Sequence, residues 1–322
     1  MVKTKKKKVI SKTLNPTDLH KKVKTVCIDC TESTIKTYIN NIKRLSRLSG
    51  YENGVPTSSA WLKQKKLLKT FDKQSLAARR VLSVAAVKMS QGYGLDKPIE
   101  WTERLKKAAE EYDTEREKRK KTDREKENWP KDGYNAIKRA ANEYKTKVSK
   151  FFRMKKPTPF QLYDIQKYVI LKLYSEHALR LDWADVFLGK QKSDSKNFLY
   201  KHPRKGWTLI MRKYKTSKFM GEQEIKISRP ASLVLSMFVP KVKESTSHGY
   251  LLSNKGGSKM SRSNLSKVLI RLTQKLLKKR IGAQIVRVLK ATKYRKSAET
   301  NAALSKEMLH NKEQHLLYAK KD

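Results

Sequence analysis

Acidic residues are scarce in this chain of 322 residues. Aspartate and glutamate number 30 against 76 lysines and arginines, so the formal net charge is +46. A globular protein with this imbalance repels itself unless an anionic partner neutralises the charge. Nucleic acid is the favoured partner, because each contact with a backbone phosphate releases counterions.

Long apolar runs are also lacking. No stretch approaches the ~20 apolar residues that a membrane-spanning helix needs, and no apolar run follows the basic N-terminus as in a signal peptide. We therefore expect an intracellular protein without a membrane partner. Residues 1–15 are lysine-rich, and we expect a disordered basic arm. A solvated tail, a DNA-tracking arm and a nuclear import signal are its alternative interpretations.

Cysteine is nearly absent, since Cys27 and Cys30 in C-I-D-C are the two in the chain. A structural zinc site needs a second pair of ligands, and a redox C-x-x-C site needs a βαβ context, whereas helices surround this pair. We expect two reduced cysteines, as in a reducing compartment. The sequence predicts no metal and no cofactor.

What is present is mostly helical patterning. Residues 16–98 predict a helical DNA-binding domain with positive charge on its outer faces. Thr31 is placed to cap a helix that ends at Gly50 and has an apolar face at helical spacing. Residues 99–156 predict a charged helical extension, supported by acid–base pairs four residues apart and broken at Trp129-Pro130. Two prolines in M-K-K-P-T-P suggest a boundary, so 157–322 form a second domain.

The second domain begins with an amphipathic helix capped by Thr158. Residues 207–214 and 222–228 predict two strands joined by the turn K-T-S-K-F-M-G, and the pattern beyond Pro230 is again helical. The predicted fold class is therefore mainly α, with a small β-hairpin or sheet in an α+β C-terminal domain.

Several residues of this domain suit metal-free cleavage of a DNA phosphodiester. Such cleavage needs a nucleophile, forked guanidinium donors for the phosphate oxygens, and a proton for the leaving oxygen. A tyrosine nucleophile stores the bond energy in a phosphotyrosine, so religation needs no ATP. No acidic cluster with metal-ligand spacing stands nearby, which argues against a two-metal nuclease. The candidates in chain order are Arg180, Lys215, Gln284, Arg287, His310 and Tyr318.

The order and spacing of these residues resemble the tyrosine recombinase (phage integrase-like) family. The matching segments are A-L-R-L-D-W-A-D-V, K-Y-K-T-S-K, Q-I-V-R and L-H-N-K-E-Q-H-L-L-Y. Their wording is most similar to that of the recombinases of large DNA viruses and mobile elements. The resemblance covers 157–322 with specific motifs and 16–94 more loosely. It implies a helical core-binding domain and a tyrosine-recombinase catalytic domain.

The resemblance implies a role for each candidate. Tyr318 would form a 3′-phosphotyrosyl bond, and Arg180 and Arg287 would bind the scissile phosphate. Lys215 would protonate the leaving 5′-oxygen, and His310 would donate to a phosphate oxygen. It also implies double-stranded DNA as partner, a homotetramer on DNA, no small-molecule substrate, and location in a host nucleus or a cytoplasmic virus factory.

The sequence departs from the family pattern at Gln284, where the family usually has His or Lys. Glutamine donates a hydrogen bond but does not transfer a proton at neutral pH. Lys290 is a candidate to compensate, and His315 competes with His310 for its role. The second departure is that only four residues follow Tyr318. Subunit coupling would then involve the helix of Tyr318 or the N-terminal region.

Further alternatives stay open. Lys213 and Lys218 compete with Lys215 for the hairpin role, although the K-T wording favours Lys215. The leading hypothesis for function is a site-specific recombinase or integrase. One alternative is a type IB topoisomerase, which would use the same mechanism. The other is a non-catalytic architectural DNA-binding protein with the same fold.

Overall fold

The computed structural model describes residues 12–191, 196–204, 206–295, 304–309 and 312–321. It divides into two compact units at Lys118 and Arg119. This division differs from the predicted boundary at 157, because the predicted extension 99–156 is shared between the units. Helix α5 (Ile99–Glu117) packs against α4 (Leu76–Gly92), whereas α7 (Asn135–Arg153) packs against α8 (Pro159–Glu176).

The first unit is a helical bundle. The predicted cap is confirmed, since the Thr31 side chain accepts a hydrogen bond from the backbone N–H of Thr34. Trp61 and Trp101 are buried in the core, and the Trp101 indole N–H donates to the Leu62 carbonyl. Besides α4 and α5, the helices are α1 (Pro16–Thr25), α2 (Glu32–Leu48), the 3₁₀ helix η1 (Ser59–Lys63) and α3 (Lys65–Asp72).

The end of the predicted disordered arm is ordered. Strand β1 (Thr13–Leu14) pairs antiparallel with β2 (Val55–Pro56), and Leu14 packs against the helical core. The prediction is therefore wrong for these residues, because an apolar side chain and a backbone partner are available to them. Residues 1–11 of the predicted arm lie outside the described residues.

The two cysteines are joined in a disulfide, so the prediction of reduced thiols is also wrong. The turn between α1 and α2 places the Cys30 N–H on the Cys27 carbonyl at 3.1 Å, and the Cα atoms are 5.3 Å apart. A four-residue turn thus brings the sulfurs together, which the spacing alone did not reveal.

The second unit surrounds a larger apolar core. The predicted cap at Thr158 is confirmed at the start of α8, where it forms a capping box with Gln161, and α8 is buried along most of its length. The other elements of this unit are α6 (Asp123–Glu127), the 3₁₀ helix η2 (Asp182–Asp185), β3 (Val186–Leu188), β4 (Asn197–His202), β5 (Gly206–Met211), α9 (Ser217–Met220), β6 (Gln223–Lys226), α10 (Arg229–Ser245), α11 (Arg262–Leu277), α12 (Ala283–Lys293) and α14 (Lys312–Tyr318).

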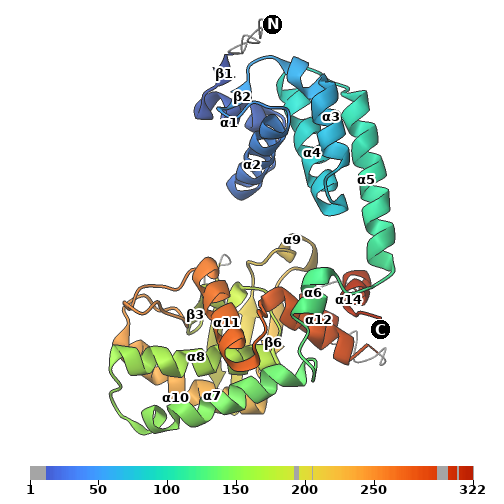
Figure 1. Cartoon of the computed structure of the whole chain (residues 1–322). Coiled ribbons are helices and arrows are strands. Elements are labelled where there is room, and N and C mark those ends of the chain that lie inside the picture. The colour runs from blue at the N-terminus through green and yellow to red at the C-terminus, as the bar shows by residue number, and fades with distance from the viewer. Residues whose placement is uncertain (1–11, 192–195, 205, 296–303, 310–311, 322) are drawn as a thin grey trace, which may run out of the picture. The chain divides into compact units, whose positions relative to one another are not determined.

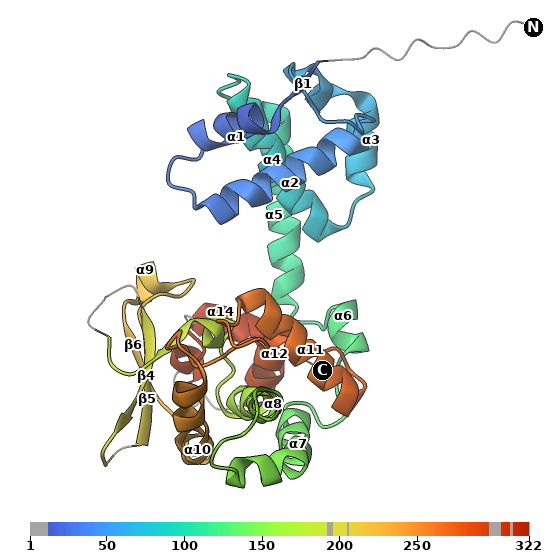
Figure 2. The ribbon, with the colours of Figure 1, turned by 90° about the vertical axis from the view of Figure 1, so that its left-hand side faces the viewer.

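The four-stranded sheet of this unit has the order β3-β4-β5-β6. Strand β3 is parallel to β4, and the other two pairs are antiparallel. The predicted hairpin is the β5–β6 pair, whereas strands β3 and β4 were not predicted from the sequence. Helix α10 lies between the sheet and α8, and α9 lies at the end of the β5–β6 hairpin (Figures 1 and 2).

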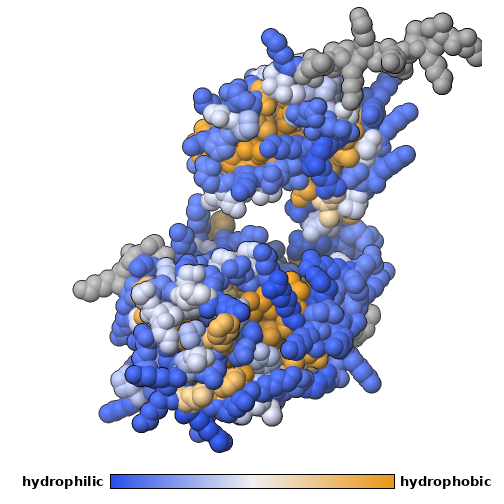
Figure 3. Space-filling view, turned by 60° about the vertical axis from the view of Figure 1, so that its left-hand side comes forward, coloured by the Kyte–Doolittle hydropathy of each residue, from blue (hydrophilic) through white to orange (hydrophobic). Residues whose placement is uncertain are grey.

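Hydrophilic side chains cover most of the visible face of each unit, with scattered apolar patches (Figure 3). This distribution agrees with the excess of lysine and arginine in the composition. Within the described residues, no helix combines the length and the apolar character that crossing a bilayer requires.

Candidate active site

Arg287 is the centre of the candidate site. It lies on α12 and is fully buried. One guanidinium nitrogen, Nη2, donates to the Met308 carbonyl at 2.9 Å, while Nε and Nη1 have no hydrogen-bond partner in the described chain. Burial and the nearby charge of Arg180 lower the pKa of Arg287 to about 10. The fold therefore holds a cation in an unfavourable place.

Arg180 supplies the second guanidinium of the site. It follows the end of α8, where the Tyr174 hydroxyl donates to the Arg180 carbonyl at 2.7 Å and fixes the backbone. Its Nη1 is buried and has no partner among the residues that the structure describes. Two neighbouring guanidiniums with unused donors form a site for an anion that accepts several hydrogen bonds.

A nearby carboxylate offsets the charge of this pair only in part. Asp182 is buried, and one of its oxygens accepts a hydrogen bond from Arg262 at 2.9 Å. Burial raises the pKa of Asp182 despite the arginine charges around it. Arg262 also pairs with Asp185, so this acidic pair anchors α11 rather than the two site arginines.

Tyr318 lies against Arg287. It is the last residue of α14, and α14 packs beside α12 (Figure 1). The guanidinium carbon of Arg287 is 5.0 Å from the centroid of the Tyr318 ring. The Tyr318 hydroxyl donates to Oε1 of Gln284, one turn before Arg287, at 3.4 Å. Gln284 thus orients the hydroxyl but, as an amide, does not accept its proton.

Lys215 is exposed in the turn between β5 and β6. The base of this turn is held by Asn197, whose side chain accepts from the backbone N–H groups of Arg212 and Lys213 at 2.9 and 2.8 Å. Its tip is tied to the C-terminal segment, because the Thr216 hydroxyl donates to the Leu309 carbonyl at 3.0 Å. The K-T pair therefore lies next to the segment that leads to α14.

His310, the predicted phosphate donor, lies outside the described residues. His315 is described and is 1% exposed, on α14 three residues before Tyr318. Neither of its ring nitrogens has a hydrogen-bond partner in the described part of the chain. Burial and the charge of Arg287 lower the pKa of His315, so the neutral imidazole is favoured.

Lys290 belongs to a different cluster, which we call the Glu307 cluster: Glu307, Lys290 and His177. Glu307 accepts hydrogen bonds from Lys290 at 2.7 Å and from Nδ1 of His177 at 3.1 Å. Lys290 also donates to the Glu176 carbonyl at 2.6 Å, and the Ser228 N–H donates to Nε2 of His177 at 3.0 Å. Lys290 is thus engaged in holding segment 304–309.

The Glu307 cluster was not foreseen from the sequence. Burial alone would raise the pKa of Glu307, but the hydrogen bond from His177 and the charge of Lys290 lower it below its ordinary value. The cluster joins α8, the start of α10, α12 and segment 304–309. It therefore positions the residues that precede α14.

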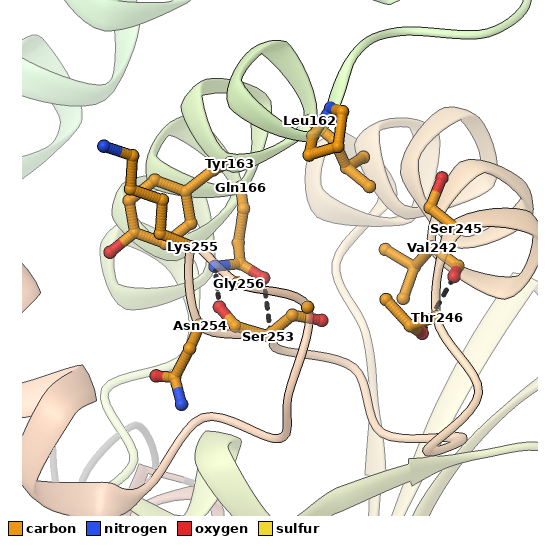
Figure 4. Close-up of a pocket in the computed structure, with 12 residues that line it drawn as sticks. Leu162, Tyr163, Gln166, Val242, Ser245, Thr246, Ser253, Asn254, Lys255 and Gly256 are labelled. Atoms are coloured by element: carbon orange, nitrogen blue, oxygen red, sulfur yellow. Dashed lines mark hydrogen bonds between the residues drawn. The ribbon is translucent and has the colours of Figure 1, made fainter.

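One pocket of this unit lies away from the candidate residues. A pocket of about 280 Å³ lies between α8, the end of α10 and the loop around Ser253 (Figure 4). There the Gln166 side chain donates to the Ser253 carbonyl and accepts from its N–H. The described lining contains none of the six candidates, and no group of three metal-ligating side chains occurs in the described part of the chain.

Chemically, the site combines the Tyr318 phenol with two guanidiniums that have unused donors. The Gln284 amide is hydrogen-bonded to the phenol, and Lys215 lies on an adjacent turn. The guanidiniums suit the non-bridging oxygens of a phosphodiester, and the phenol suits attack on its phosphorus.

Comparisons with solved structures bear on the fold. The XerH site-specific recombinase, solved in a pre-cleavage complex with its difH substrate, is 10% identical with a TM-score of 0.54. That alignment covers 97% of this chain and 88% of that one. The chain has a tyrosine-recombinase fold. At this identity the likeness concerns the fold and carries no residue roles.

Two further structures match over similar lengths. The XerA recombinase is 13% identical with a TM-score of 0.43, covering 95% of this chain and 94% of that one. The Tn1549 transposon integrase, solved with transposon right end DNA, is 14% identical with a TM-score of 0.44, covering 94% of each chain. No family model and no curated protein matches the sequence.

Proposed function

We propose that the protein breaks and rejoins double-stranded DNA through a phosphotyrosyl intermediate at Tyr318, as a site-specific recombinase or integrase. The observation that carries this proposal is that the buried Arg287 and the half-buried Arg180 both have unused guanidinium donors, with the Tyr318 ring against Arg287. A fold does not keep unused guanidinium donors in its interior for stability. An incoming phosphodiester would satisfy them.

In this mechanism, the Tyr318 phenol releases its proton to solvent water and its oxygen attacks phosphorus, while Arg180 and Arg287 bind the non-bridging oxygens. The bond from phosphorus to the 5′-oxygen breaks, and Lys215 supplies the proton that this oxygen takes up. Gln284 holds the tyrosine hydroxyl in place before attack. Religation is the reverse reaction and needs no external energy source, because the phosphotyrosine keeps the bond energy.

The remaining expectations belong to the same proposal. The net charge of +46 supports DNA as partner, and the β5–β6 turn presents Lys215, Lys218 and the 91% exposed Phe219. We infer action as a homotetramer on the DNA of a virus or mobile element, inside a cell. The comparison that carries weight is with a site-specific recombinase, which favours recombination over a topoisomerase.

The test is to trap the intermediate. The protein is incubated with a pool of nicked suicide duplexes whose sequence around the nick is randomised, and the denatured products are examined for protein-linked DNA. Wild type and the control Tyr200→Phe should form the adduct, whereas Tyr318→Phe should form none. Absence of adduct from wild type with every duplex would overturn the proposal.

A plasmid assay with the selected site separates the two activities. Strand exchange between two cognate sites is expected. Relaxation of any supercoiled plasmid without exchange would instead assign the chain to the topoisomerases.

A further inference from the structure

Segment 319–321, which directly follows Tyr318, is held through its backbone and its side chains. On α12, the Thr292 hydroxyl accepts a hydrogen bond from the Lys320 N–H at 3.0 Å. Arg295, which follows α12, donates to the Lys320 carbonyl at 2.6 Å. A helix of seven residues such as α14 has little stability of its own. The contacts at its two ends therefore determine where Tyr318 lies.

The side chain of Lys320 is held by residues 119–125, at the start of the second unit. Its ammonium lies 3.2 Å from the Glu125 carboxylate and 3.2 Å from the Lys120 carbonyl. The Lys320 and Glu125 side chains are only 12% and 13% exposed. Salt and water therefore screen this ion pair much less than a pair on the surface.

Two local features fix the partner residues in advance. The Glu125 oxygen that pairs with Lys320 also accepts hydrogen bonds from the Thr122 N–H at 2.8 Å and the Thr122 hydroxyl at 3.0 Å, within the capping box of α6. Arg119 has a φ of +54°, and its carbonyl accepts from the Lys321 N–H at 3.1 Å. A left-handed conformation is unfavourable for a residue other than glycine, and such strain is concentrated at functional sites.

We propose that Glu125 is a positioning residue for the reaction: through Lys320 it holds Tyr318 in line with the scissile phosphate. This assignment rests on the proposed function, and it gives the first residues of the second unit a role in cleavage. In this role Glu125 contacts none of the reacting atoms. Its loss should slow the attack on phosphorus and leave the affinity for duplex DNA unchanged, because a displaced nucleophile reaches the bound phosphate less often.

The first test compares single-turnover rates of adduct formation on the suicide duplex at saturating protein. Lys320→Met should lower the rate by about 10–10²-fold, as expected for a nucleophile displaced by about 1 Å. Glu125→Gln should lower it by about tenfold, because glutamine keeps the capping box but loses the ion pair. Lys320→Arg keeps the charge and should stay within about threefold of wild type. The double variant Glu125→Gln/Lys320→Met should lose no more than Lys320→Met alone, since the two residues act as a pair.

The matched control is Lys172→Met. Lys172 pairs with Glu176 at 2.7 Å, and their side chains are 15% and 17% exposed, so this variant breaks an ion pair of similar burial in the same unit. Lys172→Met and Lys320→Met should lose similar stability in urea, whereas Lys172→Met should keep the adduct rate within about twofold. An equal loss of rate in both variants would show that lost stability alone slows the reaction, and it would overturn the assignment.

Binding measurements separate positioning from direct contact with DNA. Fluorescence anisotropy should give Lys320→Met the duplex affinity of wild type within about twofold. A weaker affinity with a salt slope smaller by about one, and an unchanged rate at saturation, would make Lys320 a phosphate contact and overturn the assignment. Wild-type adduct rates in both Lys320→Met and Glu125→Gln would overturn it while leaving the proposed function intact. Failure of wild type to form any adduct would overturn both.

Discussion

At the scale of one residue, the burial of Arg287 is the feature on which the proposed function depends most. Its guanidinium is fully buried, and two of its nitrogens have no partner among the described residues. Ion pairs and uncompensated charges inside proteins are often replaced by apolar residues without loss of stability. Under the proposed function, this residue would stabilise a bound phosphate rather than the free fold.

We predict that Arg287→Met separates the two properties. Its free energy of unfolding should not fall below that of wild type, whereas adduct formation should drop by about 10²–10³-fold, equivalent to about 2.7–4 kcal/mol. Urea unfolding and single-turnover trapping measure the two quantities. The matched control is Arg262→Met, which leaves the buried Asp182 without its partner and should destabilise the protein by about 3 kcal/mol. Equal destabilisation by both variants would contradict this view of Arg287.

Four candidate residues could be predicted from the sequence, because their order and spacing along the chain match the family pattern. Arg180, Arg287, Gln284 and Tyr318 are brought together by α8, α12 and α14. The burial of His315 could not be predicted, because it depends on which face of a short helix is buried, and the cluster around Glu307 depends on residues distant in the sequence. A one-residue difference exposes Leu316 and buries His315, and no periodicity in seven residues determines that.

Segment 304–309 is the element on which the position of Tyr318 depends. The Glu307 cluster joins it to α8 and α12, and Thr216 joins it to the β5–β6 turn. We predict that Glu307→Gln destabilises the protein by about 2 kcal/mol, because Lys290 then keeps a buried charge without a counter-charge, and the partial exposure of Glu307 reduces the full cost. Urea unfolding against the exposed control Glu313→Gln measures this.

The double variant Glu307→Leu/Lys290→Met tests the same pair. It should recover most of the stability that Glu307→Gln loses, because no unpaired charge remains. Additive losses in the double variant would show that the two residues do not act as a pair.

The pH dependence of stability should report the same cluster. The pKa of Glu307 is lowered on folding, so the unfolded chain binds more protons between the folded pKa and the ordinary value of 4.5. Its stabilisation is present above pH 4.5 and is lost as the pH falls through the folded pKa. The difference in urea midpoint between wild type and Glu307→Gln should therefore shrink from pH 6 to pH 3. A constant difference would contradict this.

Elements with strong local signals were predictable, and those defined by distant partners were not. Thr31 and Thr158 begin helices as predicted, because a cap is a local hydrogen bond. Strand β3 is three residues long and depends on its pairing with β4. The unit boundary near Lys118 likewise follows from the packing of α5 and α7 on different partners, which the prolines near residue 157 do not reveal.

At the scale of the whole molecule, the net charge of +46 sets the expected mode of DNA binding. Binding to a non-cognate duplex should weaken by about 10³-fold or more between 50 and 200 mM salt, as for a protein making at least about six phosphate contacts. Fluorescence anisotropy with a labelled duplex measures the slope. Binding that changes less than about tenfold over this range would contradict a phosphate-dominated interface.

The most direct test of the central claim is to locate the covalent bond. Wild-type adduct on the selected suicide duplex is digested with nuclease and protease, and the modified peptide is sequenced by tandem mass spectrometry. The account predicts a nucleotide attached through its 3′-phosphate to Tyr318, and no modified peptide from Tyr318→Phe. A nucleotide on any other residue, or adduct formation that persists in Tyr318→Phe, would contradict it.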